Sequence, residues 1–142
     1  MADYRTTFVV DAPPNAVVQS IADLTTMNEW DSSVRSVKLA ADTGPALGRR
    51  FDVTVGFYGR EFDAVYEIIE FDCSSKVTWS IDGKASGTTT VSVTAAEAGS
   101  QIDYHLDVSM KGFAKLLDRG LKVALEGIGE NAEKGLIRRF RR

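Results

Sequence analysis

Residues 101–136 read QIDYHLDVSMKGFAKLLDRGLKVALEGIGENAEKGL, and the spacing of the apolar side chains changes in the middle of this stretch. Up to residue 110 apolar and polar side chains alternate, which is typical of a strand with one buried and one exposed face. After Gly112 the apolar residues recur every three or four positions, which predicts one long helix. Its apolar stripe consists of Phe113, Leu117, Leu121, Ala124, Ile128, Ala132 and Leu136.

The alternation extends backward through the middle of the chain. It predicts six strands in a row, at residues 33–41, 49–57, 60–71, 76–82, 86–96 and 101–110, separated by turns that contain Gly, Ser or Asp. Residues 4–10 are rich in β-branched and aromatic types and predict a further strand. Pro13 and Pro14 then introduce a short helix that ends near Leu24, and residues 25–30 are expected to form a second short helix or a turn.

The order of elements is strand, two helices, six strands and a long helix, which predicts one α+β domain over residues 1–142. We expect a seven-stranded antiparallel sheet, strongly curved, that wraps around the C-terminal helix. Because a curved sheet cannot contact a straight helix along its whole length, a cavity is expected between them. Apolar cavities of this kind are where proteins usually bind small molecules.

Four glycines interrupt the long helix, at positions 120, 127, 129 and 135. Each costs about 1 kcal/mol relative to alanine in a helix interior. A tertiary feature should offset this cost, and two are open. Either a neighbouring backbone approaches the helix closely, or the helix bends at residues 127–129.

Composition excludes several classes of site. The 142 residues include one cysteine, Cys73, and one histidine, His105, so an internal disulfide and a centre with several Cys or His ligands are both impossible. We therefore expect no metal and no cofactor. No apolar run reaches the roughly 20 residues that span a bilayer, and residues 1–5 do not begin a signal peptide. A cytoplasmic location is expected.

The formal net charge of −3 conceals an asymmetry. The last nine residues carry five of the 17 basic residues and none of the 20 acidic ones, so the rest of the chain has a net charge of −8. An acidic body argues against nucleic-acid binding, in which neutralisation of phosphates supplies most of the affinity. The basic end is favourable at a helix C-terminus, and a docking patch for an acidic partner or an anionic lipid is the alternative.

Three segments resemble a known superfamily: Val10–Pro14 entering a helix, Asp23–Asp31, and Tyr66–Asp72. Together with the order of elements, they resemble the SRPBCC superfamily, also called START-like or helix-grip, which includes the polyketide cyclase/dehydrase and lipid-transport family. Cys73 stands where proline would be expected. The resemblance covers essentially the whole chain and implies an internal hydrophobic cavity between sheet and terminal helix. It carries over no catalytic residues, because the superfamily shares no common set.

The expected cavity residues face the inside of the sheet, lie on the helical stripe, or close one end of the cavity. They are Trp30, Phe51, Phe57, Phe62, Tyr66, Trp79, Tyr104, Leu106, Leu117, Leu121 and Ile128. Among polar candidates, His105 and Cys73 are expected on the outer face and in a turn, which makes neither a catalytic group. Glu70 falls on the inner face unless a bulge intervenes near residues 68–69.

The leading hypothesis is therefore binding of a small hydrophobic molecule, such as a lipid, an isoprenoid or a polyketide-like aromatic. The alternative is an aromatase/cyclase-type enzyme that uses the same cavity, with Tyr66, Tyr104 or Glu70 moving protons. Buried polar groups in the cavity would favour the enzyme, and a purely apolar cavity would argue against it. A third possibility is an interaction module, such as a co-chaperone or a toxin-like regulator, that acts through its surface.

Overall fold

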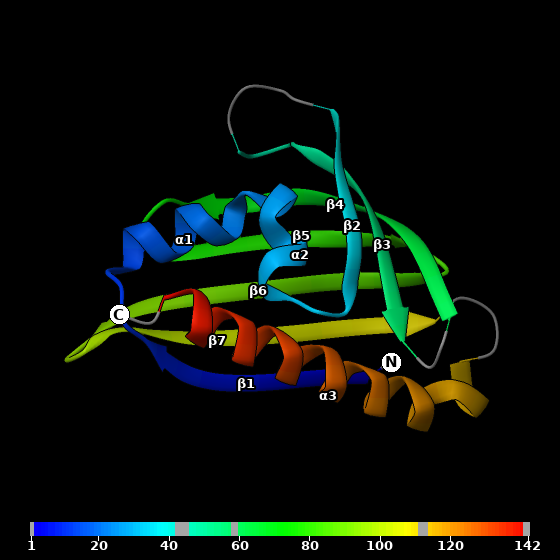
Figure 1. Cartoon of the computed structure of the whole chain (residues 1–142). Helices are drawn as coiled ribbons and strands as arrows, with labels where there is room; N and C mark the ends of the chain where they lie inside the picture. Colours follow the sequence, from blue (N-terminus) through cyan, green and yellow to red (C-terminus); the bar gives the residue numbers. More distant parts are fainter. Residues whose placement is uncertain (1, 42–45, 58–59, 111–113, 141–142) are drawn as a thin grey trace.

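The computed structural model of the chain describes residues 2–41, 46–57, 60–110 and 114–140, and of residues 2, 41, 57, 60, 110 and 114–121 it describes the backbone only. One antiparallel sheet dominates this part of the chain (Figure 1). Its seven strands are β1 (Ala2–Val10), β2 (Val34–Ala41), β3 (Arg50–Phe57), β4 (Arg60–Asp72), β5 (Lys76–Gly83), β6 (Ala85–Ala96) and β7 (Gly99–Met110). Every predicted strand is confirmed within two residues at each end.

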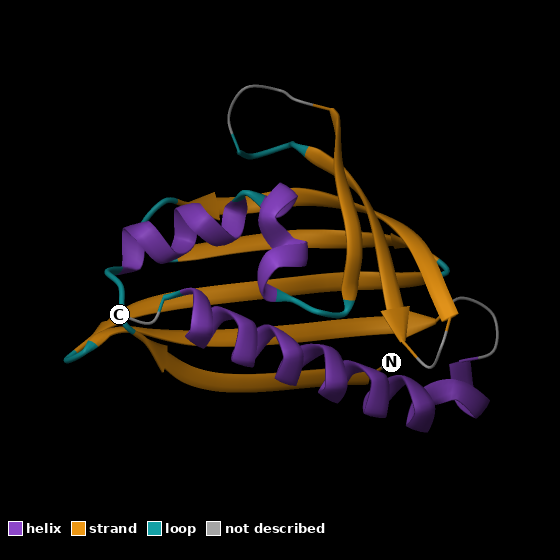
Figure 2. Ribbon diagram, in the orientation of Figure 1, coloured by secondary structure: helices purple, strands orange, loops and turns teal. Residues whose placement is uncertain are grey.

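The strands lie in the order β1-β7-β6-β5-β4-β3-β2. Successive hairpins therefore connect β2 through β7, and the first strand of the chain pairs with the last, with Thr6 opposite Tyr104. The sheet curves strongly and carries all the helices on one side (Figure 2). This is the predicted helix-grip architecture, and the helical side is where a site between sheet and helix must lie.

The helices are α1 (Pro14–Ala22), the 3-10 turn η1 (Leu24–Thr26), α2 (Met27–Trp30) and α3 (Ala114–Arg139). The long C-terminal helix is confirmed, whereas Phe113 of its predicted stripe lies outside the described residues. α3 packs mainly along β1 and β7 and touches α2 near its C-terminal end. α1 packs against β4 to β7, and α2 contacts β2 and α3 (Figure 1). In the described part of the chain, no helix is long and apolar enough to cross a bilayer.

Close contacts with neighbouring elements explain two of the four glycines in α3. Gly129 faces the ring of Tyr4 in β1, and Gly135 lies against the backbone of Trp30, so a Cβ at either position would collide. Around Gly127, by contrast, a Cβ would meet nothing within 4 Å. Two of the four glycines thus allow α3 to lie close to its neighbours.

The inner face of the sheet and the apolar faces of α1 and α3 form one hydrophobic core. Its largest fully buried side chains are Trp30, Trp79, Tyr104 and Phe51. Each such side chain contributes about 1.5–3 kcal/mol through burial. Of the aromatic residues that the alternation placed on the inner face, Phe51, Trp79 and Tyr104 therefore lie in the core.

A bulge in β4 decides the position of Glu70. The register with β5 shifts between Ile68 and Glu70, so Ile69 is the extra residue. Ile68 is fully buried, Ile69 is 42% exposed, and Glu70 is exposed and pairs with Lys76 at 3.4 Å. The bulge turns the Glu70 carboxylate to solvent, so the prediction that Glu70 moves protons inside the cavity is wrong.

Candidate functional site

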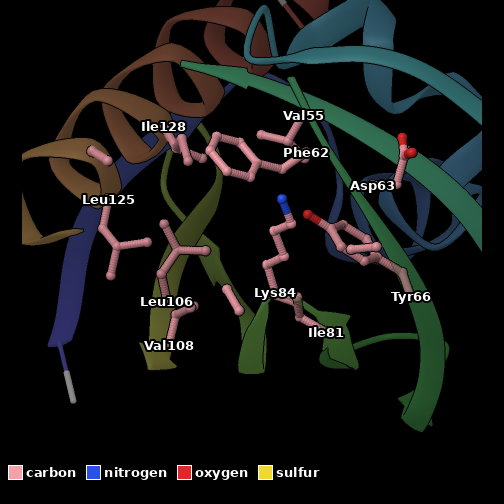
Figure 3. Close-up of a pocket in the computed structure, with 13 residues that line it drawn as sticks. Val55, Phe62, Asp63, Tyr66, Ile81, Lys84, Leu106, Val108, Leu125 and Ile128 are labelled. Atoms are coloured by element: carbon pink, nitrogen blue, oxygen red, sulfur yellow. The ribbon is translucent and has the colours of Figure 1, made fainter. Parts of the chain in front are cut away.

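A cavity of about 80 Å³ lies between the inner face of the sheet and α3 (Figure 3). Five strands and the helix contribute its walls, because the curvature of the sheet brings β3 and β4 over toward α3. The lining residues are Val55, Phe62, Asp63, Ala64, Tyr66, Ile81, Lys84, Ala85, Leu106, Val108, Ala124, Leu125 and Ile128. Apart from Asp63, Lys84 and the Tyr66 hydroxyl, every group on this wall is apolar.

Four of the predicted cavity residues line this cavity: Phe62, Tyr66, Leu106 and Ile128. Four others are at most 1% exposed and lie in the core, outside the cavity wall: Trp30, Phe51, Trp79 and Tyr104. The side chains of the remaining three, Phe57, Leu117 and Leu121, lie outside the described residues. Alternation identifies which face a residue occupies, but it does not separate the core from the cavity wall on that face.

Lys84 is a cavity residue that the sequence pattern did not indicate. It occupies the tight connection between β5 and β6, between Asp82 and Ser86, which pair with each other. Its ammonium nitrogen lies 5.9 Å from the centre of the Phe62 ring, within the range of a cation–π contact. In Figure 3 the Lys84 ammonium and the Tyr66 hydroxyl point toward one another. The sequence signal is only a lysine in a Gly-flanked hairpin turn, which is typical of a solvated loop.

Asp63 is the acidic residue on the cavity wall, but its carboxylate is hydrogen-bonded outside the cavity. Its carboxylate accepts a hydrogen bond of 2.8 Å from the hydroxyl of Thr54 on the neighbouring strand. Figure 3 shows the Asp63 side chain directed away from Lys84 and Phe62. Its charge therefore belongs to the outer face of the sheet.

A chain of aromatic contacts leads from the cavity wall into the core. The Tyr66 and Trp79 rings stack at 6.4 Å with an interplanar angle of 20°. The rings of Trp79 and Tyr104, and of Tyr104 and Trp30, meet edge to face, each pair again at 6.4 Å. Such arrangements are favourable for aromatic pairs. A change at Tyr66 is therefore transmitted directly to the environment of Trp79.

Asp31 lies at the inner end of this aromatic chain, directly after α2, and is fully buried. One carboxylate oxygen accepts a 2.9 Å hydrogen bond from the backbone N–H of Ser33. The other, Oδ2, has no hydrogen-bond partner among the described residues. Burial raises the pKa of Asp31 to about 7, although the hydrogen bonds from Ser33 oppose the shift. Asp31 was expected only as the end of a helix, because its burial depends on how α2 packs.

Two buried tyrosines accompany this carboxyl. Burial, and to a smaller extent the nearby charge of Asp31, raises the pKa of both Tyr66 and Tyr104 above the ordinary tyrosine value. Both hydroxyls therefore stay protonated at neutral pH. The Tyr104 hydroxyl has no hydrogen-bond partner among the described residues.

The remaining polar candidates lie on the surface. His105 is on the outer face of β7, with Nε2 3.3 Å from a carboxylate oxygen of Asp3. Cys73 is a free, exposed thiol in the turn after β4. Within the described residues, no three His, Cys, Asp or Glu side chains are grouped to hold a metal ion.

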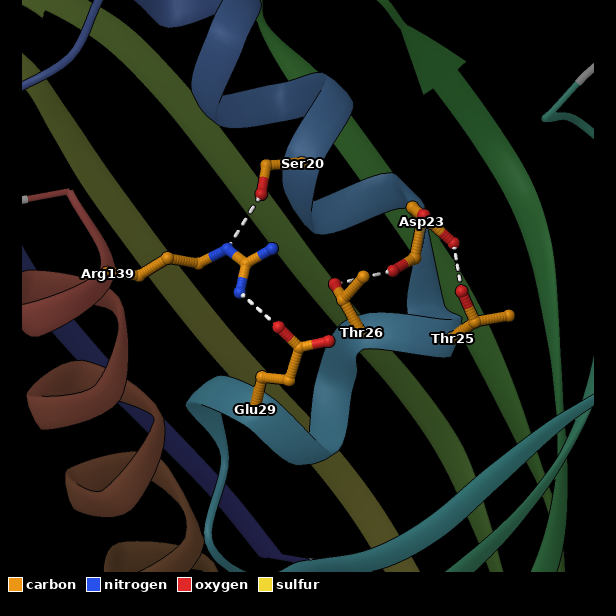
Figure 4. Close-up of polar contacts among 6 residues, drawn as sticks. All are labelled: Ser20, Asp23, Thr25, Thr26, Glu29 and Arg139. Atoms are coloured by element: carbon orange, nitrogen blue, oxygen red, sulfur yellow. Dashed lines mark hydrogen bonds and ion pairs between the residues drawn. The ribbon is translucent and has the colours of Figure 1, made fainter.

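The basic end of α3 makes contacts within the chain (Figure 4). Arg139 donates to the Ser20 hydroxyl at 3.0 Å and to the Glu29 carboxylate at 3.2 Å. Ser20 belongs to α1 and Glu29 to α2, so a single guanidinium group links all three helices. Nearby, the hydroxyls of Thr25 and Thr26 donate to Asp23 in the connection between α1 and α2.

A family model described as polyketide cyclase/dehydrase and lipid transport matches residues 1–141. No curated protein sequence matches the chain.

Many solved structures share the fold. TTHA0849 from Thermus thermophilus is 20% identical, with a TM-score of 0.85 over 97% of this chain and 96% of its own. A START superfamily protein from Mycobacterium smegmatis is 12% identical, with a TM-score of 0.73 over 99% and 97% of the two chains. The Zhui aromatase/cyclase from a Streptomyces species is 11% identical, with a TM-score of 0.74 over 96% and 88%. At these identities the similarity establishes the fold alone.

Proposed function

Because the chain belongs to the polyketide cyclase/dehydrase and lipid-transport family, we propose that it binds a small hydrophobic molecule in the cavity between the sheet and α3. The observation that carries this proposal is the cavity itself, whose wall is apolar except at a few defined points. Burying the apolar surface of a ligand there is favourable by roughly 25 cal/mol per Å². The few polar groups at its edge would orient the ligand.

Native mass spectrometry and intrinsic fluorescence test this proposal. The panel consists of octanoic acid, octan-1-ol, geraniol and 1-naphthol, which cover the lipid, isoprenoid and aromatic classes. Because Trp79 stacks on Tyr66, and Tyr66 lines the cavity, a bound molecule should change tryptophan emission. Binding of at least one class at micromolar concentration is expected.

A cavity-filling variant locates the binding site. Ala124 lines the cavity, whereas its neighbour Val123 is 55% exposed on the other side of α3. Ala124→Leu should lower the affinity at least about tenfold, because it occupies space that a ligand needs. Val123→Leu is the matched control and should leave binding unchanged. If both variants bind like the parent chain, the ligand does not occupy this cavity.

A second candidate function is proton-transfer catalysis of the aromatase/cyclase kind, and one observation favours it. The buried Asp31 carboxyl has a pKa raised to about 7 and lies near Tyr66, which lines the cavity. A group that titrates near neutrality can both accept and donate a proton, as cyclisation and dehydration require. Binding ranks first because Asp31 and Tyr104 lie behind the cavity wall.

Turnover of a short poly-β-ketone thioester distinguishes the two functions. If Asp31 takes part in catalysis, the chain should convert the thioester to a cyclised aromatic product, which is measured by its absorbance. Asp31→Asn should not form this product. A pure binding protein would bind the thioester and release it unchanged. Product formation at the same rate in Asp31→Asn would exclude the proposed role of this carboxyl.

A further inference from the structure

We propose that the ligand is an amphipathic anion, whose carboxylate is bound by Lys84 and the Tyr66 hydroxyl while its apolar part fills the cavity. This inference rests on the proposed function and narrows the class of ligand. Three residues on the cavity wall carry it: Lys84, Tyr66 and Phe62.

Lys84 places one positive charge on a wall that is otherwise nearly apolar. The β5–β6 turn sends its side chain toward the Phe62 ring, with the ammonium nitrogen 5.9 Å from the ring centre. No carboxylate of the described residues forms an ion pair with Lys84. Asp63 is hydrogen-bonded to Thr54 and directed away. The charge of Lys84 therefore remains available to a bound anion.

The Tyr66 hydroxyl adds a hydrogen-bond donor at the same place. It points toward the Lys84 ammonium in Figure 3. Burial raises the pKa of Tyr66, so this hydroxyl keeps its proton and can donate to an anion. An ammonium and a hydroxyl directed into one space suit the two oxygens of a carboxylate.

The charge of the ligand should therefore affect how tightly it binds. With a neutral ligand, the neighbours of the ammonium among the described residues are the Phe62 ring and the Tyr66 hydroxyl, besides solvent. A carboxylate replaces solvent with a charge-assisted hydrogen bond, which is stronger than a neutral one. Because Lys84 is exposed, solvent weakens this gain, and a preference of roughly 3- to 10-fold for the anion is expected.

Octanoate, octan-1-ol and methyl octanoate provide the test, because they share a tail and differ in the head group. Their affinities are compared by calorimetry at about neutral pH, where octanoate is ionised, at low and high salt. The chain as it stands should bind octanoate most tightly, and the preference should shrink as salt screens the ion pair. Lys84→Met should remove the preference by weakening the binding of octanoate, whereas Lys84→Arg should retain it.

Two further variants complete the test. Tyr66→Phe should lower octanoate affinity by a smaller factor, roughly 2- to 4-fold, because it removes one hydrogen bond and keeps the ring. Lys76→Met is the control, since Lys76 begins β5, at the end of that strand away from Lys84, and pairs with Glu70. It should leave the preference for octanoate intact.

The outcomes separate this inference from the function on which it rests. Equal binding of all three molecules, or a preference that survives in Lys84→Met, overturns the anion site while the hydrophobic cavity stands. Failure of all three to bind, together with every other member of the panel, overturns both.

Discussion

Gly135 of α3 lies directly against the backbone carbonyl group of Trp30 at the end of α2. A Cβ on residue 135 would overlap the carbonyl oxygen, which is backbone and cannot rotate away as a side chain could. This contact sets how closely the C-terminal part of α3 approaches α2. It also places Arg139, one turn later, within reach of Glu29.

Gly135→Ala should therefore destabilise the fold. Despite the higher helix propensity of alanine, the added methyl group must push α3 away from α2, at a cost of about 1 to 3 kcal/mol. Urea unfolding followed by circular dichroism measures this change.

Gly127→Ala is the matched control on the same helix. A Cβ at Gly127 would meet nothing within 4 Å, so only helix propensity changes. This variant should gain up to about 1 kcal/mol of stability. Equal stability of the two alanine variants would contradict the close contact between Gly135 and Trp30.

Strands and the long helix are predictable because a burial pattern of period 2 or 3.6 is written along the chain itself. The bulge at Ile69 replaces that pattern with a local register shift, so the orientation of Glu70 followed only from pairing with β5. The ends of the strands were therefore predictable to within two residues, whereas the orientation of the Glu70 side chain was not.

The candidate site was less predictable for the same reason. Phe62 and Tyr66 lie on a face that alternation identifies, and both reach the cavity. Lys84 reaches it because of the geometry of one turn, and Asp31 is buried because α2 packs over the sheet. The burial of Asp31 depends on contacts between segments far apart in sequence, and the position of Lys84 depends on the geometry of its turn. The alternation of apolar and polar residues indicates neither.

Asp31 should make stability depend on pH. Its pKa is raised to about 7 in the folded chain, from 3.8. Between these values the folded chain holds a proton that the unfolded chain has lost. This group therefore lowers the free energy of unfolding as pH rises from about 4 to about 7, and its effect is constant above that.

Asp31→Asn should abolish this dependence, because the amide does not titrate. Relative to the Asn variant, the parent chain should lose about 2 to 3 kcal/mol of stability between pH 5 and pH 8. Urea titrations at both pH values measure the difference. Asp52→Asn, at an exposed position on β3, controls for removal of a carboxylate. A constant difference between the parent chain and Asp31→Asn would show that Asp31 stays ionised in the fold.

Arg139 and Glu29 should contribute only modestly to stability. Their ion pair spans 3.2 Å, but the Glu29 side chain is 59% exposed, so solvent screens the attraction. A double-mutant cycle with Arg139→Gln and Glu29→Gln should give a coupling energy of about 0.5 kcal/mol that falls with added salt. Arg138→Gln, in the same turn, should show no coupling to Glu29. A coupling above about 2 kcal/mol would instead mark the link between α3 and α2 as a principal determinant of the fold.

Tyr104→Phe should leave the fold as stable as before or stabilise it slightly. The Tyr104 side chain is fully buried, and its hydroxyl has no hydrogen-bond partner among the described residues. Removing an unpaired buried hydroxyl relieves a desolvation cost, while the ring keeps its edge-to-face contacts with Trp30 and Trp79. Thermal unfolding should therefore give an unchanged or slightly higher Tm. Tyr104→Leu is the comparison, because it loses both ring contacts and should cost about 2 kcal/mol or more. A loss above about 1.5 kcal/mol in Tyr104→Phe would show that the hydroxyl forms a stabilising hydrogen bond in the core.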